Sequence, residues 1–212
     1  MSIKSILFDM DGTLIDTNEL IMESFKHTFR MYGLTFTQEE MLQFNGPPLI
    51  DTFNSILPDE AEDMVHTYRK HNLANHAKYV RSFPYVREVI EELQIKNVKM
   101  AIVSTKLRSS IQLGLKDSGL DDLFTARIGL DDVNQAKPHP EPIHIAMERI
   151  GADKETTLMV GDNHHDIEAG QNAGVQTAGV AWSMKGRAFL QAYHPTYMLE
   201  DMRDLLKLTE NE

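Results

Sequence analysis

Residues 6–14 read ILFDMDGTL, and the architecture that we expect for this chain follows from them. The apolar run begins at Ile3 and ends abruptly at Asp9, which is typical of a buried strand that leads into a loop. In an open parallel sheet, ligands bind beyond the carboxyl ends of the strands. Asp9 and Asp11 leave this strand together and can point into one small volume, while Gly12 lets the backbone turn tightly beside them. An ordinary acidic turn that caps the next helix is the alternative interpretation.

Three later apolar runs resemble the first one, and each borders segments with a helical period. They are VKMAIV at 98–103, LMV at 158–160 and TAGVA at 177–181. Repeated strand–helix units of this kind favour a parallel sheet that is covered by helices. We therefore expect an α/β fold with a Rossmann-like parallel-sheet core.

The interval between the first two predicted strands is different in kind. Ile21, Phe25 and Phe29 fall on one helical face, and breakers such as Gly46-Pro47-Pro48 separate further predicted helices at 38–44, 48–56 and 60–76. Such a long interval is not a plain connection in a compact domain. We expect a helical cap domain at residues 17–81, inserted into a core domain of residues 1–16 and 82–212.

Composition limits the classes of function. Of the 212 residues, 42% are hydrophobic and 25% are charged, as in soluble globular proteins. There are 32 acidic against 21 basic residues, a net charge of −11, and such a surface repels nucleic acids and anionic membranes. Cysteine is absent, which excludes thiolate chemistry, and the run at 3–8 is too short for a signal peptide or membrane span. We expect a cytoplasmic protein, a monomer or weak dimer, with no nucleic-acid or membrane partner.

Three further segments carry side chains suited to phosphate chemistry. Ser104 and Thr105 follow the second predicted strand and can donate to an anion, although a helix N-cap is the alternative. Lys137 precedes the proline-rich helix entry PHPEP, which can aim an ammonium group rigidly, whereas a solvated surface lysine is the alternative. Asp162 follows another strand, and Asp166 lies four residues further on.

In this order, the four motifs resemble those of the haloacid dehalogenase superfamily. Its pattern is Asp-x-Asp-Gly-Thr after the first strand, then Thr or Ser after a later strand, then Lys, then Gly-Asp-x-x-x-Asp. The resemblance covers nearly the whole chain and includes the helical cap. One departure is Ser104, where threonine is common in the family, and the hydroxyl is kept. The resemblance implies a hydrolase, in most members a phosphatase, with an aspartate nucleophile and Mg²⁺.

Other segments resemble the bacterial inorganic pyrophosphatase branch of that superfamily, which is close to the phosphoglycolate phosphatases. They are TNELI at 17–21, GPPL at 46–49, KPHPEP at 137–142, AGVAW at 178–182 and KGR at 185–187. This resemblance implies a small anionic phosphate substrate, inorganic pyrophosphate first, with phosphoglycolate or another small monoester as the alternative. A β-phosphoglucomutase-like mutase and a non-enzymatic phosphate-binding module are further alternatives.

The resemblance also implies catalytic roles. Asp9 would attack phosphorus and form an aspartyl-phosphate, and Asp11 would move the proton. Ser104 and Lys137 would act in catalysis by holding the phosphoryl oxygens, and Thr105 would bind substrate beside them. The stiff loop at 46–48 is able to face the site, and the Gly46 N–H is a further expected substrate contact.

The expected metal ligands are oxygens, which suit the octahedral coordination of Mg²⁺. They are the side chain of Asp9, the main-chain oxygen of Asp11 and the side chain of Asp162. Asp166 is expected either to bind the ion directly or to support these ligands.

Overall fold

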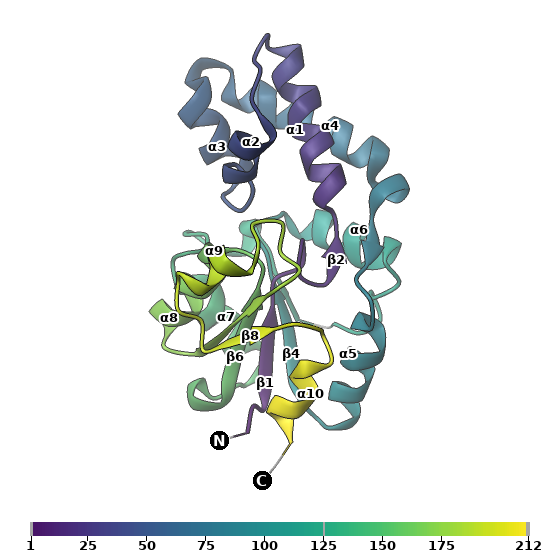
Figure 1. Ribbon diagram of the computed structural model, residues 1–212, viewed down its shortest axis with the longest axis vertical. Coiled ribbons are helices and arrows are strands. Elements are labelled where there is room, and N and C mark those ends of the chain that lie inside the picture. The colour runs from purple at the N-terminus through teal and green to yellow at the C-terminus, as the bar shows by residue number, and fades with distance from the viewer. Residues whose placement is uncertain (1, 125, 211–212) are drawn as a thin grey trace.

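The computed structural model describes residues 2–124 and 126–210, and its core is a six-stranded sheet (Figure 1). Neighbouring strands pair in parallel throughout. From one edge to the other, the strands are β5 (Ala126–Ile128), β4 (Lys99–Val103), β1 (Ser5–Phe8), β6 (Thr157–Gly161), β7 (Gln176–Val180) and β8 (Tyr197–Leu199). The α/β fold with a parallel sheet, predicted from the sequence, is confirmed.

Strand β1 lies in the middle of the sheet, between β4 and β6. Phe8 is in register with Ile102 on one side and with Val160 on the other. All four residues of β1 are buried, as expected for a strand with helices on both faces. The carboxyl ends of β1, β4 and β6 therefore meet at one edge of the sheet.

Two helical layers cover the sheet. One face packs against α5, α6 and α10, and the opposite face packs against α7 and α8, each over its own apolar cluster. A short helix, α9, contacts β7. The bounds are α5 (Val86–Ile95), α6 (Arg108–Asp117), α7 (Glu141–Ile150), α8 (His164–Ala173), α9 (Arg187–Gln191) and α10 (Asp204–Thr209).

A helical unit, residues 18–79, stands above the carboxyl edge of the sheet (Figure 1). It has an apolar core of its own, built around the stacked Phe25 and Phe29 rings, with Phe53 and Tyr68 packed against them. Its helices are α1 (Asn18–Met31), α2 (Gln38–Gln43), α3 (Leu49–Ile56) and α4 (Ala61–Tyr79). The predicted apolar face of the first helix is thus the centre of this core.

The two connections between the helical unit and the sheet run side by side. They form the short strands β2 (Ile15–Asp16) and β3 (Arg81–Ser82), which pair antiparallel. The domain boundaries expected from the sequence fall at these places, but the ladder was not predicted, because two-residue strands leave no periodic signal. Within the described part of the chain, no helix is both long enough and apolar enough to cross a membrane.

Candidate active site

Three carboxylates meet at the carboxyl edge of the sheet. Asp9 follows β1, Asp162 follows β6, and Asp166 lies in the first turn of α8. All three are buried, and each offers an oxygen within 4.8 Å of the oxygens offered by the other two. The structure therefore brings together three of the residues that the sequence analysis singled out.

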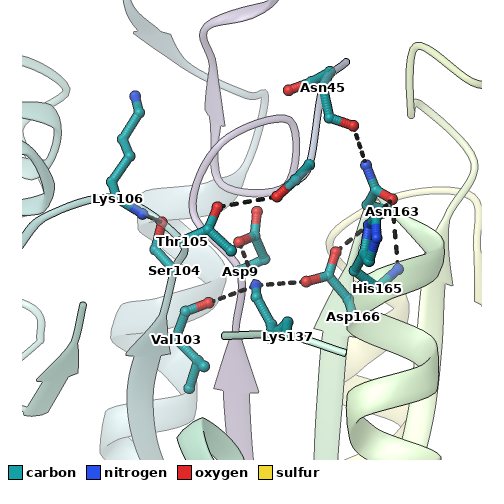
Figure 2. Close-up of polar contacts among 11 residues, drawn as sticks. Asp9, Asn45, Val103, Ser104, Thr105, Lys106, Lys137, Asn163, His165 and Asp166 are labelled. Atoms are coloured by element: carbon teal, nitrogen blue, oxygen red, sulfur yellow. Dashed lines mark hydrogen bonds and ion pairs between the residues drawn. The ribbon is translucent and has the colours of Figure 1, made fainter. Parts of the chain in front are cut away.

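Lys137 lies beneath this cluster and is only 3% exposed. Its Nζ donates to Asp9 Oδ1 at 2.8 Å, to Asp166 Oδ1 at 2.5 Å and to the Val103 carbonyl at 2.8 Å (Figure 2). Burial lowers the pKa of Lys137, but the attraction of Asp166 and Asp9 outweighs burial and leaves the pKa above its usual range. This lysine is a buried cation, not a solvated surface residue.

The carboxylates are costly to ionise together. Burial, together with the charges of Asp166 and Asp11, raises the pKa of Asp9 to about 7 against the opposing effect of Lys137. Burial and the charges of Asp9 and Asp166 likewise raise the pKa of Asp162 well above its usual value. A buried, oxygen-only cluster with excess negative charge matches what Mg²⁺ requires, so these residues fit that ion.

Asp11 is not part of the three-carboxylate cluster. Its Oδ1 accepts from Lys106 Nζ and from Thr17 Oγ1, both at 2.7 Å. The next residue, Gly12, has φ +76°, and a Cβ on it would collide with the Asp162 carboxylate. Glycine is required here because the loop must turn in the left-handed region directly against a site carboxylate.

The two hydroxyls after β4 have separate partners. Ser104 Oγ accepts from the Lys106 N–H at 3.2 Å, so its own proton stays available for donation. It does not cap α6, whose N-cap is Leu107. Thr105 Oγ1 donates to the Gly46 carbonyl at 3.1 Å (Figure 2).

The helical unit contacts the carboxyl edge of the sheet through the loop at 45–48. The Asn45 carbonyl accepts from Asn163 Nδ2 at 2.8 Å and from Lys185 Nζ at 3.0 Å. Gly46 has φ +127°, and a Cβ on it would overlap the Asn163 amide. The helical unit is therefore seated on the loops that follow β4, β6 and β7.

A cavity of about 430 Å³ lies between the helical unit and the sheet edge. All of the predicted site residues line it, and its opposite wall is largely apolar. The predicted residues are Asp9, Asp11, Gly46, Ser104, Thr105, Lys137, Asp162 and Asp166; the apolar wall contains Ile21, Phe25, Phe44, Leu49, Ile50 and Tyr68.

Several polar residues of this site were not predicted from the sequence. Asn163 was visible in principle, because it is the N-cap of α8 and forms a capping box with Asp166. Lys106 contacts Asp11 over a separation of 95 residues, and no local pattern marks it. Thr17, six residues from Asp11, lay in the quoted motif TNELI without an assigned role. Lys185 lay in a quoted motif without an assigned role.

With this geometry the chain can be compared with known proteins. Residues 6–180 match the haloacid dehalogenase-like hydrolases, and the chain belongs to this family of enzymes. It is 53% identical to the pyrophosphatase PpaX of Oceanobacillus iheyensis over 208 residues, which cover 98% of this chain and 97% of that protein. It is 48% identical to the pyrophosphatase PpaX of Bacillus cereus strain B4264 over 212 residues, covering 100% and 98%.

Solved structures agree on the fold. A haloacid dehalogenase-like hydrolase from Streptococcus pneumoniae matches with a TM-score of 0.85 and 27% identity, covering 98% of this chain and 99% of that one. The resemblance to the superfamily, and within it to the inorganic pyrophosphatase branch, is confirmed.

Proposed function

We propose that this hydrolase cleaves inorganic pyrophosphate with Mg²⁺ and forms an aspartyl-phosphate on Asp9. The observation that carries the proposal is the buried Asp9 carboxylate, held by Lys137 beside Asp162 and open to the cavity. The similarity to PpaX pyrophosphatases over nearly the whole chain supports the choice of substrate.

In the first step, an Asp9 oxygen forms a bond to one phosphorus atom. The bond from that phosphorus to the bridging oxygen breaks, and phosphate leaves with a proton from Asp11. Lys137 offsets the negative charge on Asp9 and on the phosphoryl group. The Ser104 hydroxyl, whose proton is not used in a hydrogen bond to Lys106, donates to a phosphoryl oxygen.

In the second step, water attacks the phosphorus of the aspartyl-phosphate and gives a proton to Asp11. The bond between that phosphorus and the Asp9 oxygen breaks, which releases the second phosphate and restores both carboxyl groups. Two phosphates form from one pyrophosphate and one water, so atoms and charges balance.

The side chains of Asp9 and Asp162 and the main-chain oxygen of Asp11 would hold Mg²⁺. The ion would neutralise the repulsion between these carboxylates and the phosphoryl oxygens. Asp166 accepts from Lys137 through one oxygen and from the Asn163 N–H through the other. In this proposal, Asp166 therefore orients the residues around the ion and does not bind the ion directly.

Residues 17–81 form, in this proposal, a cap domain that moves on a core of residues 1–16 and 82–212. The β2–β3 ladder is the hinge, because both connections pass through it. The loop at 45–48 closes the cavity by its contacts with Thr105, Asn163 and Lys185. Closure excludes water and brings the Gly46 backbone near the substrate.

A side-by-side comparison of kcat/KM for pyrophosphate, phosphoglycolate and glucose 1-phosphate with Mg²⁺ tests the proposal. We expect pyrophosphate to be the best substrate by at least about tenfold. A preference for phosphoglycolate would refute pyrophosphate as the substrate but would leave the proposed mechanism unchanged. Isomerisation of glucose 1-phosphate without phosphate release would indicate a mutase.

A further inference from the structure

Three cationic side chains line the cavity: Lys106, Lys137 and Arg69. The two lysines belong to the core, and each already pairs with a carboxylate: Lys106 with Asp11, and Lys137 with Asp9. Arg69 belongs to α4 of the helical unit and, among residues 2–124 and 126–210, has no carboxylate within ion-pair distance. Its guanidinium therefore keeps its hydrogen-bonding capacity for a ligand.

Arg69 lies at the rim of the cavity. It shares one face of α4 with Asn72, Leu73 and His76, which are three, four and seven positions further on and also line the cavity. Arg69 is exposed although it lines the cavity, and Leu73 beside it is 64% exposed. Around Arg69 and Leu73, this face of α4 thus borders both the cavity and the solvent.

The rest of the helical unit offers no competing cation. Its other lining residues are apolar or uncharged, apart from His76, whose Nδ1 is engaged with Asp117 at 2.7 Å. An anionic group that extends from the sheet edge toward α4 would therefore meet an apolar wall and one guanidinium. In a chain of net charge −11, such an isolated cation beside the site is a specific feature.

We propose that Arg69 binds the anionic leaving group of the substrate, which makes it a specificity-determining residue. The inference rests on the phosphohydrolase activity proposed above. The attacked phosphoryl group lies against Asp9 and Lys137, and the remaining group extends toward the helical unit. A guanidinium can bind a phosphate or a carboxylate through two parallel hydrogen bonds, so the preferred substrates carry a second anion.

The test measures binding, so it does not depend on turnover. Wild type, Arg69→Met and Lys70→Met are titrated by calorimetry with Mg²⁺ and two probes, methylenediphosphonate with two anionic groups and methylphosphonate with one. Lys70 is the matched control, because it is an exposed cation on the same helix that does not line the cavity. Arg69 is exposed, so its substitution leaves stability almost unchanged, which thermal unfolding checks.

We expect Arg69→Met to weaken the binding of methylenediphosphonate by about 10- to 100-fold and to leave the binding of methylphosphonate within about twofold of wild type. Lys70→Met should bind both probes within about twofold of wild type. Equal losses for both probes, or no loss, would overturn the inference. So would a wild type that binds the two probes equally well. Failure of wild type to hydrolyse pyrophosphate would instead refute the proposed substrate and leave this binding result to decide the role of Arg69.

Discussion

Asp9 and Asp11 stand two residues apart, yet their carboxylates have opposite surroundings. Asp9 is 7% exposed and shares Lys137 with Asp166 at the bottom of the cavity. Asp11 is bound by Lys106 and Thr17, away from the carboxylate cluster. The first arrangement suits a nucleophile held in one orientation. Asp11 lines the same cavity, where its carboxylate can reach the leaving oxygen of a bound substrate.

Asp11→Asn should therefore show a loss that depends on the leaving group. For phenyl phosphate, whose phenolate is basic, we expect kcat/KM to fall by about 100-fold or more, because protonation assists departure. For p-nitrophenyl phosphate, whose leaving group needs no proton, we expect a much smaller loss. The parameter kcat/KM reports only the steps up to aspartyl-phosphate formation, so the later attack by water does not enter. Equal losses on both esters would remove Asp11 from the acid role.

How much of the site could be predicted depends on where each residue stands in the chain. Asp9, Ser104 and Asp162 follow apolar strands, so the topology of a parallel sheet places them at one edge. Arg69 belongs to the helical unit and reaches the cavity only through the packing of this unit on the core. Lys106 lies in the same core loop as Ser104, but its contact with Asp11 joins residues 95 positions apart. Such long-range packing leaves no periodic or motif signal in the sequence.

At the scale of elements, the loop at 45–48 links the helical unit to three core loops. The Gly46 carbonyl accepts from Thr105, and the Asn45 carbonyl accepts from Asn163 and Lys185. Pro47 and Pro48 stiffen the segment that follows. The approach of this loop to Asn163 leaves no room for a side chain at Gly46.

Gly46→Ala should displace the loop and impair catalysis. The new Cβ overlaps the Asn163 amide, and φ +127° is strained for alanine. We expect kcat/KM for pyrophosphate to fall by roughly 10- to 100-fold. Gly33→Ala is the matched control, because Gly33 also has positive φ, +69°, but has open space around it. It should lose about 1 kcal/mol in urea unfolding and keep its activity. Similar activities of the two variants would show that the loop contacts are dispensable.

The strands that the sequence predicted are those whose residues form a short, mostly apolar run. Strands β1, β4, β6 and β7 are of this kind, with four or five residues each. Strands β5 and β8 have three residues and are only partly buried, because they lie at the edges of the sheet. Pairing with a neighbour, which a local pattern does not encode, fixes these short strands.

At the scale of the whole molecule, a second contact joins the helical unit to the core near the hinge. His76, near the end of α4, is 4% exposed, and its Nδ1 lies 2.7 Å from Asp117 Oδ2 in α6. Among the close contacts between a basic and an acidic side chain in the described residues, this contact alone crosses between the two parts. The two partners are 41 residues apart, so only the tertiary fold reveals the contact.

Asp117→Ala should loosen the helical unit. It leaves the buried Nδ1 of His76 without a partner, so we expect the free energy of unfolding to fall by about 1–3 kcal/mol and kcat/KM for pyrophosphate to fall with it. His76→Asn is the control, because an amide nitrogen can replace Nδ1 as a donor and the lost Nε2 has no partner. This variant should stay close to wild type. If both variants lost activity equally, the imidazole itself would be required instead of the bond to Asp117.

The most direct measurement of the central claim is phosphate release from pyrophosphate by wild type and by Asp9→Asn, with Mg²⁺ and with EDTA. We expect wild type to release phosphate with Mg²⁺, to stop with EDTA and to recover when Mg²⁺ is added in excess. Asp9→Asn, which keeps the shape of the side chain but is a poor nucleophile, should stay below roughly one hundredth of the wild-type rate. Metal-independent release, or an Asp9→Asn rate near that of wild type, would contradict the account.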